Sequence, residues 1–479
     1  MELRTDLLIG GEWVDGAGRF EDVNPFTEET IAEVAEAGPD QVDDAVRSAR
    51  EAFESDEWRG MDPHHRARLL NRLADLIEER ASELAEIETR DNGKPSFESS
   101  RVDLPSVIEN YRYFAGWADK VGGKTIPVSG PFLNYTRREP LGVVGAIVPW
   151  NYPLSLASWK VAPALACGNS VVLKPAEQTP LTALKLGELA LEAGFPPGVL
   201  NVIPGRGEPT GQALVEHPYV DKISFTGSVE TGKKVMRSAA ENLTEVHLEL
   251  GGKSPNVVFA DADVEAAVRG ATTGIFYGKG EVCAAGSRLY LEESIHDEFM
   301  ERLLERTEKM KPGDPTEAGT RLGPLVSAEQ RDRVMKYIEA GRDDGARLVA
   351  GGGTTSVDGT GYFVEATIFD DVDPEMTIAR EEIFGPVLAT LTFDGLENAV
   401  EQANQTIYGL AAGVWTRDVG KAHRFARDVQ AGTVWVNTYN RYDSASPFGG
   451  YKQSGFGREL GKQALDEYTQ TKSVWVNLD

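Results

Sequence analysis

The chain of 479 residues carries 76 acidic against 49 basic residues, a formal net charge of −27, and only two cysteines, Cys167 and Cys283. This charge disfavours nucleic acid or an anionic membrane surface as a partner, and two cysteines exclude a disulfide scaffold, so we expect a cytoplasmic protein. No apolar run reaches the roughly 18 residues of a membrane-spanning helix, and the N-terminal stretch lacks the long apolar block of a signal peptide.

The first 120 residues predict strands followed by helices. Apolar residues recur at helical spacing over 42–58 and over 65–93, which predicts one helix in each stretch, the second ended by Gly93. Segment 122–140 is rich in glycine and proline, and it predicts a turn followed by an extended excursion.

From residue 141 onward, apolar runs alternate with amphipathic stretches. The run 141–149 is nearly unbroken, as expected of a strand buried on both faces. Strand and helix alternating at this spacing predict a parallel sheet with right-handed crossovers, which binds ligands at the carboxyl ends of its strands. The predicted strands are 141–149, 170–175, 199–205, 220–227 and 244–252, and a helix over 181–194 ends at Gly194.

A second alternating region runs from about 254 to 440. Its predicted helices include 262–277 and 296–310, and its strands include 287–293 and 433–437. The apolar tail 473–478 predicts a terminal strand, and such a strand often pairs with another subunit.

The stretch SFTGSVETGKK, residues 224–234, has the form of a phosphate-binding turn. It matches most of a P-loop, but Lys234 occupies the position where Ser or Thr would hold magnesium. The spacing between Gly227 and Gly232 also departs from the GxGxxG pattern of dinucleotide sites. What remains is a strand-to-helix turn whose free N–H groups favour an anion, with a plain tight turn as the alternative.

Two residues have the surroundings of reactive groups. Cys283 lies among glycines and alanines in GKGEVCAAGSR, which leave its thiol accessible as a nucleophile requires; the alternative is a buried core cysteine, our interpretation of Cys167. Glu249 ends a strand before two glycines and is a candidate general base whose pKa would rise in a partly apolar site, or else an exposed turn residue. Of the six histidines, His247 is the best candidate for the base of a Cys–His hydrolase.

Seven stretches follow one another in an order that is informative as a set. They are PWNYPL (149–154), VLKPAEQTP (172–180), FTGSVETG (225–232), LELGGKSP (248–255), GEVCAAGSR (280–288), EEIFGPV (381–387) and PFGGYKQSGFGRE (447–459). Together they resemble the NAD(P)-dependent aldehyde dehydrogenase superfamily, in its non-acylating, broad-substrate branch, over essentially the whole chain. Glu281 stands where many relatives carry Gln, and Val229 where many carry Thr.

The resemblance implies roles for several groups of residues. Cys283 would be the nucleophile, Glu249 the general base and Asn151 the side-chain donor to the oxyanion. Lys160 and Glu459 would relay protons from the base. The aldehyde tunnel would be lined by Tyr152, Trp159 and Phe448. The dinucleotide would be bound by Ile147, Pro149, Trp150, Lys174, Glu177, Gly207, Gly211, Phe225, Gly227, Ser228, Leu250, Glu382 and Phe384.

The resemblance also implies an α/β fold with three parts. These are a Rossmann-like parallel-sheet cofactor domain (1–121 and 141–251), an α/β catalytic domain (252–460) and a small β oligomerisation element (122–140 and 461–479), which implies a homodimer or homotetramer. The implied reaction oxidises an aldehyde to a carboxylic acid with NAD+ through a cysteine thiohemiacetal and thioester, without a metal. NAD+ is favoured over NADP+ because Glu177 would accept a hydrogen bond from a 2′-hydroxyl and repel a 2′-phosphate.

Several alternatives stay open at this point. A Cys-dependent hydrolase or acyltransferase would need no redox step, a CoA-acylating dehydrogenase is disfavoured by Glu249, and a structural role would leave the motifs idle. The aldehyde is a neutral aliphatic or aromatic one, betaine aldehyde held by aromatic rings, or a semialdehyde, for which Arg441 is a candidate donor. Only 18 of the 49 basic residues are lysines, which predicts a high-salt organism; the alternative is ordinary solvated acidic helices.

Overall fold

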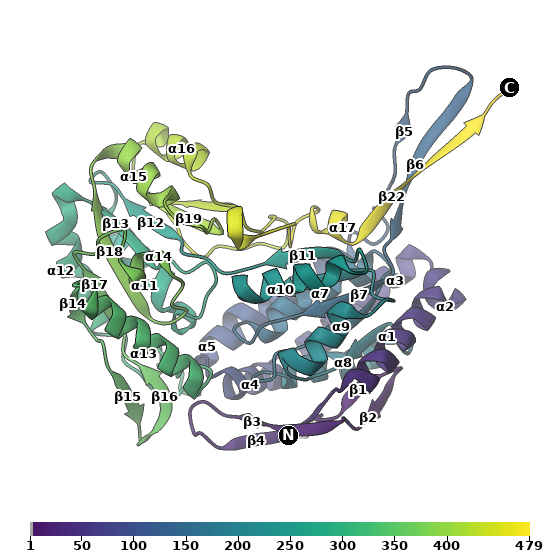
Figure 1. The fold of residues 1–479 in the computed structure, drawn as a ribbon, viewed down its shortest axis with the longest axis horizontal. Coiled ribbons are helices and arrows are strands. Elements are labelled where there is room, and N and C mark those ends of the chain that lie inside the picture. Colours follow the sequence, from purple (N-terminus) through teal and green to yellow (C-terminus); the bar gives the residue numbers. More distant parts are fainter. Residues whose placement is uncertain (1–2) are drawn as a thin grey trace.

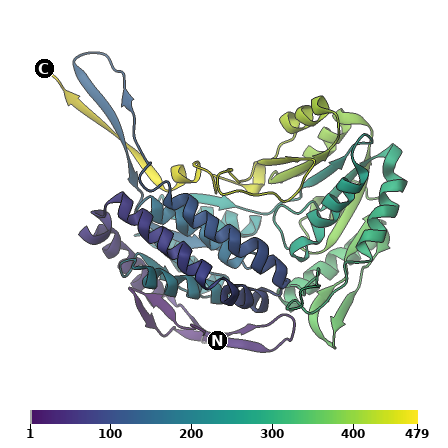
Figure 2. The same cartoon turned by 180° about the vertical axis from the view of Figure 1, so that it is seen from behind.

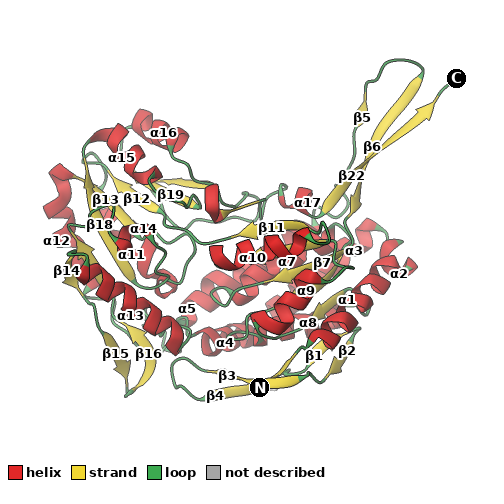
Figure 3. Cartoon of the chain, viewed as in Figure 1, coloured by secondary structure: helices red, strands yellow, loops and turns green. Residues whose placement is uncertain are grey.

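The computed structural model describes residues 3–479 as an α/β protein with two large sheets and a smaller one that projects from the body (Figures 1 and 3). The first sheet has a parallel centre flanked by antiparallel edge strands. In order across the sheet, its strands are β2 (Glu12–Val14), β1 (Leu7–Ile9), β9 (Leu200–Val202), β8 (Ser170–Lys174), β7 (Val143–Ile147), β10 (Lys222–Thr226), β11 (Glu245–Glu249) and β21 (Gly455–Phe456). The predicted parallel sheet is confirmed.

Helices cover both faces of this sheet because successive residues of a buried strand point to opposite sides. On β7, Val143 and Ile147 join one apolar cluster, whereas Val144 and Ala146 join the other. The first cluster includes α1 (Pro39–Glu54), α9 (Gln212–Glu216) and α10 (Val229–Ala240); the second includes α3 (Pro63–Glu79), α4 (Ala81–Asn92), α6 (Leu104–Ala115), α7 (Pro153–Ala166) and α8 (Leu181–Ala193). Figure 2 shows the dark blue helices of the second layer in front of the sheet.

Each of the two long N-terminal helices predicted from the sequence was wrong in extent, because each is interrupted. Ser55 ends α1, and its hydroxyl accepts a hydrogen bond from Trp58 N, which starts the short helix α2 (Asp56–Arg59). Arg80, at φ −105° and ψ 13°, separates α3 from α4, and the break lets both helices bury apolar faces in the same core. Gly93, at φ 82°, ends α4 as predicted.

The second large sheet confirms the second alternating region. Its strands, in order, are β14 (Arg347–Ala350), β17 (Thr367–Asp370), β18 (Val387–Phe393), β13 (Arg288–Glu292), β12 (Pro255–Val258), β19 (Ala411–Trp415) and β20 (Thr433–Val436). One face packs on α11 (Val264–Phe276) and α12 (His296–Thr307), and the other on α13 (Ala328–Asp343), α15 (Gly395–Asn404) and α16 (Val419–Asp428). Hairpins β3–β4 (Gly18–Val23, Thr30–Glu36) and β15–β16 (Thr354–Val357, Thr360–Val364) lie outside these sheets.

The third sheet is an arm made of β5 (Thr125–Ile126), β6 (Phe132–Pro140) and β22 (Thr469–Asn477). Both views show it projecting from the body (Figures 1 and 2). The terminal strand pairs with β6 of its own chain from Thr469↔Pro140 to Asn477↔Phe132, because the extended excursion 122–140 supplies an antiparallel neighbour. Pairing of the terminal strand with another subunit stays a prediction, and it would involve the other edge of β22.

The late segment of the chain returns to the first sheet. β21 follows the second sheet in sequence, yet it pairs antiparallel with β11 through Leu248↔Phe456 and Glu249↔Gly455. This pairing brings the motif 447–459 beside the carboxyl end of β11. The predicted domain boundaries at residues 121, 141, 251 and 460 stay a prediction. Across residues 3–479, we find no helix with the length and apolar character needed to cross a membrane.

Candidate active site

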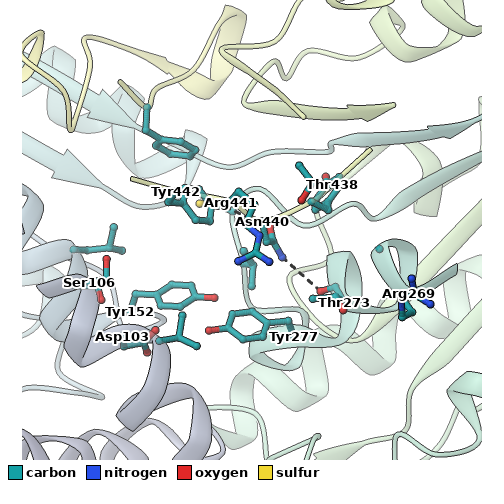
Figure 4. A pocket seen from close by; sticks show the side chains of 18 of the residues that line it. Asp103, Ser106, Tyr152, Arg269, Thr273, Tyr277, Thr438, Asn440, Arg441 and Tyr442 are labelled. Atoms are coloured by element: carbon teal, nitrogen blue, oxygen red, sulfur yellow. Dashed lines mark hydrogen bonds between the residues drawn. The ribbon is translucent and has the colours of Figure 1, made fainter. Parts of the chain in front are cut away.

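A cavity of about 480 Å³ lies between α7 and the loop that follows β20 (Figure 4). Its wall is largely aromatic: the rings of Trp159 and Phe448 are 5.5 Å apart at 65°, and those of Tyr442 and Phe448 are 5.5 Å apart at 69°. Tyr152 and Cys283 also line it. The structure therefore places the predicted nucleophile and the three predicted tunnel residues on one cavity.

The Cys283 thiol is half-buried on the wall of this cavity. Burial, together with the carboxyl groups of Glu249 and Glu382, raises its pKa to about 12. A cation near Cys283 would favour the thiolate, but the ionisable groups around this cysteine are acids, which disfavour it. Attack by this sulfur requires a base that accepts its proton as the bond forms.

Glu249, at the end of β11, has the surroundings of such a base. Burial, reinforced by Glu459, raises the pKa of its carboxyl group well above the usual range. Its Oε1 lies 3.2 Å from His247 Nε2, and its Oε2 is buried without a hydrogen-bond partner among the described residues. Burial lowers the pKa of His247, which is therefore neutral and serves Glu249 rather than a thiolate.

Behind Glu249 lies a buried chain of polar side chains. Lys160 Nζ donates to Glu459 Oε1 and also to Ser224 Oγ at 3.3 Å. Tyr468 Oη donates to Ser224 Oγ at 3.2 Å. All four of these side chains are almost fully buried, so this chain of polar groups lies inside the protein and begins beside the predicted base.

Asn151 is held against the peptide that precedes the cysteine. Its Nδ2 donates to the backbone carbonyl of Glu281 at 2.9 Å, and its Oδ1 is buried without a hydrogen-bond partner among residues 3–479. The backbone N–H of Cys283 likewise has no acceptor in that part of the chain. The Asn151 amide is therefore bonded two residues before the free Cys283 N–H, and an oxyanion site requires two such donors.

A buried ion pair supports this peptide. Lys279 Nζ lies 2.9 Å from Glu281 Oε2 and donates to Asn92 O at 2.9 Å and Asn92 Oδ1 at 2.8 Å. Glu281 Oε1 accepts from Val326 N at 3.1 Å. Glu281, which departs from the usual Gln of relatives, is therefore matched by a neighbouring lysine and does not face the thiol as an unpaired charge.

The ion pair also stabilises an unusual turn. Gly278, Lys279 and Gly280 adopt φ values of 57°, 61° and 75°, and such a conformation costs an ordinary side chain about 1–3 kcal/mol. A Cβ on Gly280 would lie 2.1 Å from Gly385 O, so only glycine fits there. The contacts of Lys279 with Glu281 and Asn92 offset the strain at its own position.

The two glycines after Glu249 make room for the site. A Cβ on Gly251 would lie 2.1 Å from Glu382 Oε2, and a Cβ on Gly252 would lie 2.4 Å from the Cys283 carbonyl oxygen. Gly252 N donates to Glu382 Oε1 at 2.9 Å. Burial raises the pKa of Glu382 to about 7. The motif LELGGKSP therefore needs both glycines to seat Glu382 and Cys283 close to the base.

The glycine turn of residues 224–234 starts α10. Ser228 caps the helix, since its Oγ accepts from Thr231 N at 3.2 Å. Gly232 lies inside α10, where a Cβ would come 2.6 Å from the Leu250 side chain. The second glycine thus serves helix packing and is not part of a phosphate-binding loop, so the partial P-loop match has a structural cause.

The predicted dinucleotide residues lie around the carboxyl ends of β7, β8, β10 and β11. Lys174 ends β8; burial lowers its pKa to about 8, while the carboxylates of Glu177 and Glu36 act in the opposite direction. Its Nζ donates to Pro175 O at 2.8 Å, and a Cβ on Gly211 would lie 3.4 Å from its Cε. Gly207, which precedes Gly211, has open space at its Cβ position.

The remaining predicted dinucleotide residues span the two large sheets. Ile147 ends β7 and is almost buried, and Trp150 follows it after Pro149. The Trp150 ring meets Phe384 edge-on at 5.3 Å, and Phe384 has a left-handed backbone with φ 63°. Phe225 lies under Gly227, whose Cβ would touch its ring at 2.5 Å.

Sequence reasoning missed several contributors to this region. They are Tyr277 and Tyr442 on the cavity wall, Lys279 and Asn92 at the turn, His247 as the partner of Glu249, and Ser224 and Tyr468 on the polar chain. Most of these residues lie in or beside segments already singled out, such as Lys279 in GKGEVCAAGSR and Ser224 in SFTGSVETGKK. The sequence did not show which of them meet in space, as Lys279 meets Asn92 and Ser224 meets Tyr468. Within residues 3–479, no cluster of three or more His, Cys, Asp or Glu side chains forms a candidate metal site.

Comparison with known proteins gives one consistent result. The profile of the aldehyde dehydrogenase family matches residues 13–474. The mitochondrial aldehyde dehydrogenase of Homo sapiens is 51% identical over 478 residues, covering 99% of this chain and 92% of that protein. The structure of an aldehyde dehydrogenase from Bacillus cereus in complex with NAD+ superposes with a TM-score of 0.98 at 50% identity, covering 100% of this chain and 97% of that one. A betaine aldehyde dehydrogenase from Staphylococcus aureus, in complex with NAD+, has a TM-score of 0.98 at 43% identity and covers 100% and 98%.

Proposed function

Because the chain belongs to the aldehyde dehydrogenase family, we propose that it oxidises an aldehyde to a carboxylic acid with NAD+, using Cys283 as nucleophile and Glu249 as base. The observation that carries this assignment is the convergence of a cavity-facing thiol, the Asn151 amide and a buried carboxyl group of raised pKa. His247 is bound to Glu249, which disfavours a Cys–His hydrolase. Glu249 itself disfavours a CoA-acylating enzyme, since it would hydrolyse the thioester.

The residues present fit a bound dinucleotide. The N-terminus of α10 follows β10 at the sheet edge where such ligands bind, and its first turn offers N–H groups to an anion. Buried Lys174 has hydrogen-bonding capacity beyond its single contact with the Pro175 carbonyl. Glu177 and Glu36 both lie close enough to influence Lys174, and Arg206 is engaged by Glu36 at 2.7 Å. Two carboxylates beside Lys174, with Arg206 already paired, would repel the 2′-phosphate of NADP+ and therefore favour NAD+. Initial rates measured with each cofactor test this preference.

The chemistry divides among the residues as follows. As Cys283 Sγ bonds to the aldehyde carbon, Glu249 accepts the thiol proton, and Asn151 Nδ2 with the Cys283 N–H holds the resulting oxyanion. The nicotinamide cofactor supplies a hydride acceptor, which leaves a thioester on Cys283. Glu249 removes a proton from the water that hydrolyses this thioester, and the buried pair of Glu459 and Lys160 receives that proton.

The two cysteines provide a matched test. Replacing Cys283 by Ala should abolish NADH formation while NAD+ binding is retained, because the nucleophile is lost and the cofactor residues are intact. Replacing buried Cys167 by Ala should leave turnover measurable, since its thiol belongs to the core and burial raises its pKa to about 12. Turnover by the Cys283 variant would contradict the assignment. Retained turnover in the Cys167 variant would show that the loss of turnover on replacing Cys283 comes from that thiol and not from removing any cysteine.

The arm supports assembly into a homodimer or homotetramer. It exposes an apolar group on two adjacent strands and the chain end, Phe132, Leu133, Trp475, Val476 and Leu478. The outer edge of β22 pairs with no other strand of residues 3–479. Exposed apolar side chains beside an open strand edge favour burial against a second copy.

Two further properties rest on composition. The Cys283 thiol reaches a cavity and both cysteines are free, which suits the reducing cytoplasm. The net charge of −27 on a lysine-poor chain suits a concentrated salt solution, where repulsion between carboxylates is screened.

A further inference from the structure

We propose that the aldehyde cavity contains a carboxylate-binding subsite formed by Arg441, Tyr152 and Tyr277, so that the preferred substrate is an aldehyde with an acidic group at its far end. This inference rests on the proposed oxidation of an aldehyde at Cys283. It extends that function by naming the class of substrate.

Arg441 is placed for this role by the loop after β20. Trp435 Nε1 donates to the backbone carbonyl of Arg441 at 2.9 Å, and Asn440 Nδ2 reaches Thr273 O at 3.5 Å, so both sides of the arginine are anchored. Figure 4 shows its guanidinium group directed towards Tyr152 and Tyr277. Among residues 3–479, no carboxylate pairs with it. An arginine with free donors beside a cavity suits a bidentate anion.

The two tyrosines supply hydroxyl groups at the same place. In Figure 4 their hydroxyl ends point towards each other below Arg441. Tyr277 Oη is buried and has no hydrogen-bond partner among the described residues. Burial raises the pKa of both tyrosines, so both hydroxyls are neutral donors. An unpaired buried donor is costly unless a ligand meets it, and a carboxylate oxygen would.

The acidic residues behind the tyrosines are already engaged. Asp103 Oδ2 accepts from Lys94 Nζ at 2.6 Å, and Glu88 Oε1 accepts from the same group at 3.0 Å. Glu98 Oε1 accepts from Gly278 N at 3.3 Å. Of the two arginines that line the cavity, Arg269 is paired with Glu265, and Arg441 is the one without a carboxylate partner among the described residues. A cationic aldehyde held by the aromatic wall would be repelled by it.

The experiment compares aldehydes matched in length and differing in one carboxylate. We would measure kcat and KM with NAD+ for adipate semialdehyde against hexanal, for para-formylbenzoate against benzaldehyde, and for betaine aldehyde. The ratio of kcat/KM for the acid over the neutral aldehyde should be about tenfold or more, since a charge-assisted hydrogen bond is gained. Arg441→Leu should bring the ratio close to one, mainly by raising KM for the acids. Arg441→Lys and Tyr277→Phe should each retain part of the preference.

Arg269 provides the matched control. It lies at the rim of the same cavity, but its Nη1 is held by Glu265 Oε1 at 3.1 Å (Figure 4). Arg269→Leu removes the same charge and should leave the ratio as in the wild type. Three results would overturn the subsite. They are a wild-type kcat/KM ratio of acidic to neutral aldehyde near one, a ratio that Arg441→Leu does not change, and a preference for betaine aldehyde.

Failure of the proposed function would look different, because no aldehyde would then yield NADH. In that case calorimetric binding of adipate tests the subsite without turnover. Binding that Arg441→Leu weakens about tenfold supports the subsite, and absence of binding overturns it.

Discussion

The side-chain amide of Asn151 donates to the backbone carbonyl of Glu281 at 2.9 Å, two residues before Cys283. The Glu281 side chain is in turn paired with Lys279 in a buried turn. The proposed oxyanion donor is therefore oriented by the loop that carries the nucleophile.

Breaking the Lys279–Glu281 pair should lower turnover. Glu281→Gln leaves Lys279 buried without its counter-charge, and such a loss costs about 3–5 kcal/mol of folding free energy. We expect kcat to fall roughly tenfold with a smaller change in KM, because the donor is displaced more than the tunnel. The double variant Lys279→Gln, Glu281→Gln removes both charges and should recover stability relative to Glu281→Gln. Stability is measured by thermal unfolding and kcat by steady-state kinetics. If the single and the double variant lost the same stability and the same kcat, the coupling between Lys279 and Glu281 would be contradicted.

The state of Glu249 predicts the pH dependence of turnover. A general base acts in its deprotonated form, and burial raises the pKa of Glu249 above the usual carboxyl range, so kcat should still increase with pH above the range where an ordinary glutamate is already ionised. Glu249→Gln should lower kcat by about 10²–10⁴, the usual contribution of a general base. The variant should also lose the burst of NADH, because Glu249 is the base placed to accept the thiol proton when Cys283 attacks the aldehyde. A rapid-mixing trace with a full burst would confine Glu249 to hydrolysis of the thioester.

Gly252 should tolerate no side chain. In Gly252→Ala the new Cβ would meet the Cys283 carbonyl at 2.4 Å, so the cysteine loop must move. We expect kcat to fall at least tenfold, since small displacements of a reacting group are costly. Gly319→Ala is the control because nothing lies within 4 Å of its Cβ position. Comparable activity in the two variants would show that the loop accommodates the methyl group.

The arm should control assembly. Trp475 is 59% exposed in the single chain and packs edge-on against Phe132 at 6.0 Å. Trp475→Glu would place a charge in the surface proposed to bury it, and should shift the protein to a smaller species in analytical ultracentrifugation. Lys309→Glu on the body, just beyond the C-terminal end of α12, offers a charge change outside the arm as a control. A wild-type protein that sediments as a monomer would refute the assembly.

Salt should stabilise the fold. Repulsion among the excess of 76 acidic over 49 basic residues weakens as the Debye length shrinks from about 10 Å at 0.1 M to about 3 Å at 1 M. We expect the midpoint of thermal unfolding and the activity to increase over this range in potassium chloride. Unfolding midpoints that stay constant from low to high salt would argue against a high-salt origin.

The sequence by itself determined the alternating α/β pattern, the seven motifs and the residue types of the site, because these depend on local periodicity and on residues adjacent in the chain. It also located the strand ends at which Lys174 and Glu249 lie. It failed where the backbone leaves helical geometry inside a periodic stretch, as at Ser55 and Arg80.

Tertiary structure decided the rest, since the decisive contacts join residues far apart in sequence. The antiparallel pairing of β21 with β11 brings Glu459 to Lys160, and the turn at Lys279 fastens Asn92 to the cysteine loop. Burial, which sets the raised pKa of Glu249 and of Cys283, likewise arises only when the two large sheets and their helices close around the cavity. No periodicity encodes such neighbours, because electrostatic and packing energies depend on distance in space.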